Sequence, residues 1–171
     1  MKKIHLDTTF LMPIFNLETS VPNLDTEFLK LLSETNYLFS YSTVSIIEIK
    51  WIIIQLAKKG EIIEELEKQF SESLGALRNN NRFKEITMID PLLNDVSYVL
   101  TKLGHKDYFD TVIASSALWE ADMFITQDKE LVKRLNLLIR KKLFSMLSPI
   151  LLLNWNQFKN NEKNISNSNN S

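Results

Sequence analysis

Short apolar segments alternate along this chain with longer segments of helical periodicity, and this alternation limits the folds that the sequence can adopt. The expected strands cover residues 3–7, 37–41, 85–89, 123–126 and 150–155. The expected helices cover residues 8–15, 25–33, 43–59, 61–77, 92–103, 107–121, 128–135 and 137–147. Such alternation favours a parallel sheet reached through right-handed crossovers. We therefore expect an α/β fold, a three-layer α/β/α sandwich around a central, mainly parallel sheet.

The cysteine and histidine content restricts the kinds of metal site that the chain can form. The chain has 171 residues, no cysteine and only two histidines, His5 and His105. Disulfides, zinc–thiolate sites, thiol nucleophiles and multi-histidine metal sites are therefore excluded. Any metal ion must be held mainly by oxygen, which points to a hard cation.

Charge and hydropathy give a second set of expectations. Twenty basic and 21 acidic residues leave a net charge of -1, so a nucleic-acid partner would need a local basic patch. The N-terminus lacks the pattern of a signal peptide, and the apolar stretch 46–56 is too short to span a bilayer. We expect a cytoplasmic protein without membrane contact. Residues 1–158 are expected to form one domain, and the Lys-, Asn- and Ser-rich residues 159–171 a disordered tail.

Three acidic residues stand at ends of expected strands or starts of expected helices. Asp7 follows the first strand, Asp128 follows the strand over 123–126, and Asp110 lies near the start of an apolar helix. In open α/β sheets the ligand crevice lies at the carboxyl ends of the strands. Helix capping is the alternative role for each of the three.

A fourth acid, Glu48, lies within a helix whose other residues are apolar on nearly every face. A carboxylate in such a helix is expected to be partly buried, and a buried charge needs a cation, a partner or a raised pKa. The alternatives are a salt bridge, for example with Lys50, or an exposed position.

Taken together, the four acids indicate a metal site. Carboxylates brought close together repel one another and take up protons, and a divalent cation relieves this repulsion. Carboxylate and water ligands suit Mg²⁺ and Mn²⁺, which can polarise a phosphate and activate water. We expect phosphodiester hydrolysis, with these acids as the metal ligands and catalytic residues: Asp7, Glu48, Asp110 and Asp128.

Four segments resemble motifs of the PIN-domain nucleases, in the order in which that family has them. The segments are Leu-Asp-Thr-Thr-Phe-Leu at residues 6–11, Ser-Ile-Ile-Glu-Ile at 45–49, Asp-Thr-Val-Ile-Ala-Ser-Ser-Ala at 110–117 and Ile-Thr-Gln-Asp at 125–128. The similarity covers roughly residues 3–135 and is strongest to VapC-like toxins and related prokaryotic PIN proteins.

The resemblance implies a Rossmann-like fold and cleavage of single-stranded RNA with Mg²⁺ or Mn²⁺. It places Asp7, Glu48 and Asp110 as the core acids, Asp128 as the fourth acid, and Thr126 as the hydroxyl two residues before it. Thr8 or Thr9 are weaker candidates for orienting water.

The resemblance also implies a biological role. The leading hypothesis is the toxin of a toxin–antitoxin pair, with single-stranded or structured RNA, an antitoxin protein and a second copy in a homodimer as partners. A PIN nuclease of RNA processing or ribosome maturation is the alternative within catalysis. A PIN-like scaffold that binds RNA or protein without cutting is the third reading.

Other candidate residues have simpler explanations. Trp51, Trp119 and Trp155 could stack on bases, but their apolar surroundings favour core packing. His105 is expected at the surface or in a turn, and Asp107 as a helix cap or outer residue. The basic clusters could contact RNA phosphates or form solvated helix faces, and they lie at 58–59, 78–84, 133–134 and 140–142.

Overall fold

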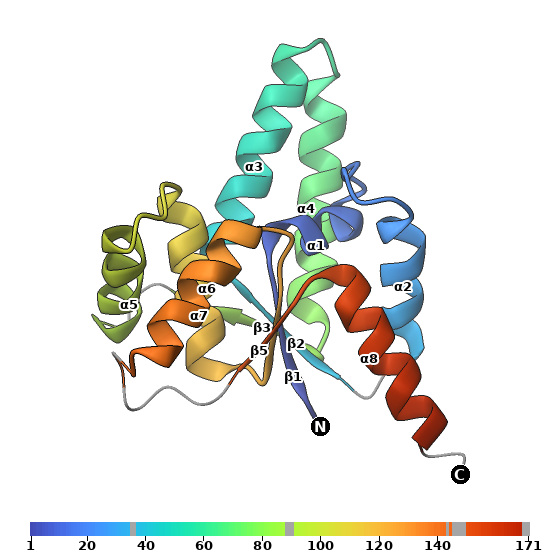
Figure 1. The fold of residues 1–171 in the computed structure, drawn as a ribbon. Coiled ribbons are helices and arrows are strands. Elements are labelled where there is room, and N and C mark those ends of the chain that lie inside the picture. The colour runs from blue at the N-terminus through green and yellow to red at the C-terminus, as the bar shows by residue number, and fades with distance from the viewer. Residues whose placement is uncertain (35–36, 88–90, 143, 145–149, 169–171) are drawn as a thin grey trace.

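A computed structural model shows a five-stranded parallel sheet enclosed by helices (Figure 1). The structure describes residues 1–34, 37–87, 91–142, 144 and 150–168. The strand order is β3-β2-β1-β4-β5, and every neighbouring pair is parallel. The strands are β1 (Lys3–Leu6), β2 (Leu38–Ser42), β3 (Phe83–Ile86), β4 (Met123–Ile125) and β5 (Leu151–Leu153). The expected α/β fold with a parallel central sheet is confirmed.

Helices cover both faces of this sheet (Figure 1). Their bounds are α1 (Thr8–Leu11), the 3₁₀ helix η1 (Met12–Phe15), α2 (Leu24–Glu34), α3 (Thr43–Lys58), α4 (Ile63–Asn79), α5 (Pro91–Lys102), α6 (Tyr108–Glu120), α7 (Lys129–Arg140) and α8 (Trp155–Ser168). Ile4 and Leu6 of β1 pack into the core formed with α1, α2, α3, α4 and α8. Phe124 of β4 packs into the opposite core, with α5, α6 and α7.

Helix α6 is deeply buried, and its composition allows this. Residues 111–118 are all buried, and four consecutive small residues lie at 114–117. Small side chains, including Ala114 and Ala117, let the helix approach β1 and β2 closely. The hydroxyls of Ser115 and Ser116 donate to the carbonyls of Thr111 and Val112, so their burial leaves neither donor unsatisfied.

Several element boundaries differ from the predictions, among them those of β3, of α7 and of β5, which ends at Leu153 rather than at residue 155. Strand β3 begins at Phe83, two residues before the predicted start, and residues 88 and 89 of that prediction lie outside the described residues. Helix α7 continues to Arg140, whereas the predicted helix over 137–147 runs into residues that the structure does not describe.

The C-terminal segment also departs from expectation. Helix α8 begins at Trp155 and runs to Ser168, across the domain limit predicted at residue 158. Trp155 and Phe158 are buried and stack with ring centroids 5.7 Å apart, and Lys159 pairs with Glu27 of α2. These contacts attach the start of α8 to the core. The division into a domain and a disordered tail stays a prediction.

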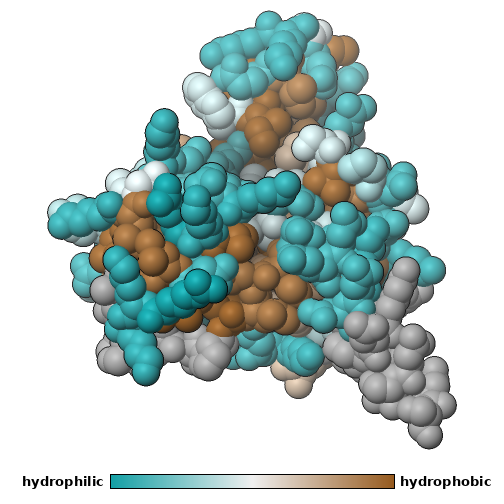
Figure 2. All heavy atoms as spheres, viewed as in Figure 1, coloured by the Kyte–Doolittle hydropathy of each residue, from teal (hydrophilic) through white to brown (hydrophobic). Residues whose placement is uncertain are grey.

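Helices α3 and α4 form a hairpin that projects beyond the sheet (Figure 1). Hydrophobic residues remain visible along this hairpin (Figure 2), and Ile47, Trp51 and Ile62 are each more than half exposed. Among the described helices, none combines the length and apolar character needed to cross a membrane.

Candidate metal centre

The carboxyl edge of the sheet brings together the acids that the sequence singled out. Asp7 follows β1 directly, and Asp128 lies three residues beyond the end of the neighbouring strand β4. The backbone N–H of Asp7 donates to the carbonyl of Ile125 at 3.2 Å, which continues the β1–β4 ladder to this edge. The pairing of these two strands therefore places both acids at one site.

Asp7 is held from two directions. One carboxylate oxygen accepts from the backbone N–H of Thr8 at 2.8 Å, and the other accepts from the hydroxyl of Thr126 at 2.6 Å. The Thr126 oxygen in turn accepts from the backbone N–H of Asp128 at 3.1 Å. The Thr126 hydroxyl thus connects the two acids, and Asp7 also caps α1.

Glu48 reaches the same edge from the first turns of α3. Ser42 caps this helix, and Gly60, with φ of 105°, follows its end as expected. The carboxylate of Glu48 is half-buried and accepts a hydrogen bond from the Thr8 hydroxyl. Lys50, the alternative partner considered for Glu48, instead pairs with Glu67 at 3.0 Å.

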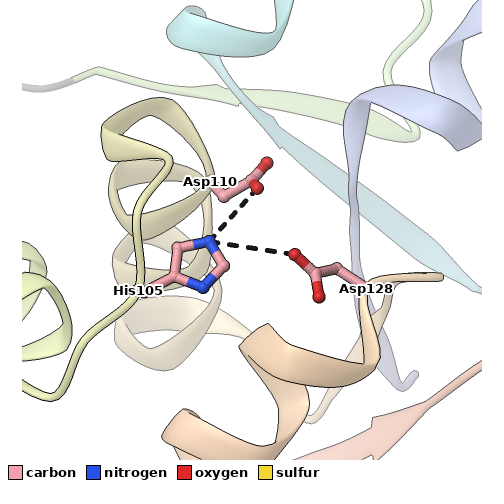
Figure 3. A group of neighbouring side chains, drawn as sticks. All are labelled: His105, Asp110 and Asp128. Carbon is pink, nitrogen blue, oxygen red and sulfur yellow. Dashed lines mark hydrogen bonds and ion pairs between the residues drawn. The ribbon is translucent and has the colours of Figure 1, made fainter.

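Asp107 and Asp110 come from the start of α6. Asp107 is the N-cap, and its carboxylate accepts from the backbone N–H of Phe109 at 2.9 Å, so the expected capping role is confirmed. Asp110, one turn into the helix, points towards Asp128 and His105 (Figure 3). The structure thereby gathers all four predicted acids, together with Thr126 and Asp107, at one edge of the sheet.

These acids line a cavity of about 600 Å³. Five carboxylates face it, and among the described residues that line it none is Lys or Arg. The remaining wall is partly apolar and includes Met12, Ile47, Trp51 and Phe109. The cavity is therefore a concentration of negative charge without a basic side chain to balance it. Its carboxylates belong to Asp7, Glu48, Asp107, Asp110 and Asp128.

The crowding of these acids affects their protonation. Burial raises the pKa of Asp7 to about 6, and the charges of Asp110 and Asp128 add to this effect. Burial also raises the pKa of Glu48 to about 7, with Asp7, Asp110 and Asp107 contributing repulsion. The pKa of Asp110 is raised mainly by burial as well, while the hydrogen bond from His105 opposes the rise. A cation in the cavity would favour the ionised carboxylates and so oppose these shifts.

The donor set fits a divalent ion. Ligand atoms of Glu48, Asp107 and Asp110 lie within 4.8 Å of one another, and those of His105, Asp110 and Asp128 do so too. Oxygen donors from several carboxylates are the ligands that Mg²⁺ and Mn²⁺ take in proteins. Asp107 is less available as a ligand, because one of its oxygens caps α6.

Comparison with known proteins supports the fold. No protein-family model matches the sequence, and no curated protein matches it in a sequence search. Among solved structures, VapBC2 from Rickettsia felis bound to a DNA fragment from their promoter matches with a TM-score of 0.56 and 18% identity, over 90% of this chain and 98% of that chain. FitAB bound to the IR36 DNA fragment matches with a TM-score of 0.56 and 14% identity, over 88% and 94% of the two chains. Both matched chains are PIN domains.

This chain has the PIN-domain fold. The sequence resemblance and the structure therefore agree on the fold, although sequence identity to the matched structures is low. Within the PIN-domain fold, the four predicted acids occupy one cavity, and their roles as ligands and catalytic residues stay a prediction.

Two residues at the site differ from the sequence expectations. His105, expected at the surface or in a turn, follows the turn after α5, but its side chain is only 6% exposed and contacts the acids. Trp51, expected in the core, is 59% exposed and lines the cavity. Trp119 is 44% exposed, so core packing is wrong for it too, whereas it is confirmed for Trp155. Apolar periodicity could not show that Trp51 is uncovered, because α3 projects beyond the sheet (Figure 1).

Proposed function

We propose that this protein is a metal-dependent endoribonuclease that hydrolyses phosphodiester bonds of single-stranded RNA with Mg²⁺ or Mn²⁺. The observation that carries the proposal is the cavity in which five carboxylates converge without a lysine or arginine among its described lining residues. Asp7, Asp107 and Asp128 cap helices, but the clustered carboxylates still repel one another, and a bound cation would relieve this repulsion. RNA, as a polyanion, approaches such a site productively only with a divalent ion in place.

Each residue of the site has a definite task in this proposal. Asp7, Glu48, Asp110 and Asp128 hold the metal, and a bound divalent ion supplies polarisation of the scissile phosphate and activation of water. Thr126 fixes the carboxylate of Asp7 and the start of α7. Thr8 orients Glu48, and Thr9 lines the cavity.

We further propose that the protein is the toxin of a toxin–antitoxin pair. The fold likeness to VapBC2 and FitAB supports this assignment, and so does the resemblance of the motifs to VapC-like toxins. An antitoxin partner follows from it, and homodimerisation and a cytoplasmic location are predictions that go with it. A housekeeping nuclease of RNA processing or ribosome maturation would use the same acids. A scaffold that binds without cutting would have no use for repelling carboxylates.

Cleavage of RNA tests the proposal directly. We expect the wild-type protein to cut labelled single-stranded RNA in Mn²⁺ or Mg²⁺ and to stop when EDTA is added. Asp110→Asn is expected to be inactive, whereas the matched variant Asp95→Asn, at an exposed position on α5, is expected to retain full activity. Binding without cleavage by the wild type would favour the scaffold. Growth arrest on induced expression, absent for Asp110→Asn, would distinguish a toxin from a processing enzyme.

The exposed ring of Trp51 gives a prediction about substrate binding. Trp51 lies one turn after Glu48 on α3, lines the acidic cavity, and has the Lys58 ammonium 5.3 Å from its ring centroid. An exposed aromatic ring beside a cation suits an unpaired base and its phosphate. Because stacking contributes roughly 1–3 kcal/mol per base, we expect Trp51→Leu to weaken RNA binding by about tenfold.

Fluorescence anisotropy of a labelled RNA measures this effect, with both variants placed in the non-cleaving Asp110→Asn background. Trp119→Leu is the matched control, because Trp119 is also exposed but lies outside the cavity lining. Equal losses of affinity for the two tryptophan variants would contradict a specific role for Trp51.

A further inference from the structure

A turn at the end of α5 carries His105 into the acidic site. The N–H of Gly104 donates to the carbonyl of Thr101 at 2.9 Å, and the N–H of His105 donates to the carbonyl of Leu100 at 3.2 Å. This pair of hydrogen bonds is the Schellman motif, in which Gly104, with φ of 92°, reverses the chain. The reversal brings the imidazole back over the helix end, and the side chain is only 6% exposed.

The imidazole lies between two of the acids (Figure 3). Its Nε2 atom is 3.2 Å from Oδ2 of Asp110 and 3.8 Å from Oδ2 of Asp128. The other oxygen of Asp128 already accepts from the backbone N–H groups of Glu130 and Leu131, at 2.7 and 2.9 Å. Capping therefore fixes Asp128 so that its remaining oxygen faces His105.

These separations match those of neighbouring ligands around one ion. Two ligands at about 2.1 Å from a six-coordinate ion and at right angles to each other lie about 3 Å apart. Nε2 and the two Oδ2 atoms all lie within 4.8 Å of one another, so a small shift of side chains would let all three contact a single ion. If His105 served only to donate a hydrogen bond to Asp110, there would be no need for Asp128 to face the same Nε2 atom.

We propose that His105 is a nitrogen ligand of the metal centre, together with Asp110 and Asp128, and that it makes the site select Mn²⁺ over Mg²⁺. The inference rests on the proposed metal-dependent function and names the ion that it uses. Mg²⁺ is bound almost entirely through oxygen, whereas Mn²⁺ also favours oxygen but belongs to the first-row transition metals, which accept nitrogen ligands. One imidazole among the carboxylates therefore strengthens Mn²⁺ binding without a matching gain for Mg²⁺.

The spectrum of bound Mn²⁺ provides the first test, because the chain has only two histidines and His5 is fully buried within the sheet. Pulsed electron paramagnetic resonance of the tag-free protein with Mn²⁺ is expected to show coupling to an imidazole nitrogen. His105→Gln is expected to abolish this coupling, although its side-chain amide can still donate a hydrogen bond to Asp110. Nitrogen coupling that persists in His105→Gln, or its absence from the wild type with Mn²⁺ bound, would overturn the inference.

Titration calorimetry with each ion provides the second test. We expect the wild type to bind Mn²⁺ at least about tenfold more tightly than Mg²⁺, and His105→Gln to lose most of this ratio while its Mg²⁺ affinity changes little. Equal losses for both ions would show that His105 only positions the carboxylates, and would refute the ligand role. Failure of the folded wild type to bind either ion would instead refute the proposed metal-dependent function. Circular dichroism of each variant establishes that it is folded.

Discussion

Asp7→Asn is expected to reduce metal-dependent RNA cleavage at least about a hundredfold while making the metal-free protein more stable. The loss of activity follows because Asp7 is proposed as a metal ligand, and a hundredfold corresponds to about 3 kcal/mol of transition-state stabilisation. An amide oxygen is a much weaker ligand than a carboxylate. Single-turnover cleavage rates in saturating Mn²⁺ measure the effect.

The gain in stability follows from the burial of Asp7. Its side chain faces Asp110 and Asp128, and burial raises its pKa to about 6, so ionisation at neutral pH opposes folding. The asparagine removes this charge but cannot accept from both Thr8 and Thr126 as the carboxylate does. We therefore expect a net gain of only about 1 kcal/mol in the free energy of unfolding at pH 7.5.

Asp95→Asn serves as the control, because it makes the same chemical change at an exposed position. It should alter neither the cleavage rate nor the stability. A loss of activity in Asp7→Asn accompanied by a loss of stability would indicate damage to the fold rather than removal of a ligand.

Glu48→Gln is expected to stabilise the metal-free protein increasingly as the pH rises from 5 to 8. The pKa of Glu48 rises from 4.5 to about 7 on folding, so the folded state retains a proton that the unfolded state has released. Its ionisation therefore lowers the stability of the wild type as pH increases through that interval. Because Glu48 is only half-buried, we expect the advantage of glutamine to grow by on the order of 1 kcal/mol, less than the full shift implies.

The wild type must be compared with Glu48→Gln because the titration of His5 changes the stability of the wild type with pH in the opposite direction to that of Glu48. Burial lowers the pKa of His5 to about 3, so its contribution to stability falls as the pH drops below 6.5. That contribution is the same in the wild type and in Glu48→Gln, and it cancels in the difference. Urea unfolding at several pH values gives the two free energies. An advantage that stays constant with pH would contradict the raised pKa, and added Mn²⁺ should reverse the advantage at pH 8.

The sheet was predictable because parallel strands are buried on both faces and appear in a sequence as short apolar runs. All three residues of β4 are buried, and its prediction was accurate to one residue. The edge strand β3 carries a weaker signal, since only Ile86 of its four residues is fully buried. Its boundaries were accordingly misplaced.

Asp7 and Asp128 were predictable for a related reason, because strand ends in a parallel sheet share one edge, whereas Glu48 and Asp110 were found from their places in apolar helices. His105 was not, since its burial depends on the chain reversal at Gly104 and on the packing of α5 beside α6. The pattern Gly104-His105 followed by Asp107 and Asp110 contains the available signal: a helix stop, then a ligand-type residue, then a helix cap. To interpret this pattern as a metal ligand, one must know that the C-terminal end of α5 lies at the carboxyl edge of the sheet.

The hydrogen bond between Thr126 and Asp7 joins residues 119 positions apart in the chain. It forms only when β4 lies beside β1, and β4 is synthesised after α2 to α6. A chain still emerging from the ribosome therefore lacks Asp128 and the support of Asp7 until residues 126–128 have been made. Under the proposed ribonuclease activity, a nascent chain therefore cannot cleave the RNA of its own ribosome until its sheet is nearly complete.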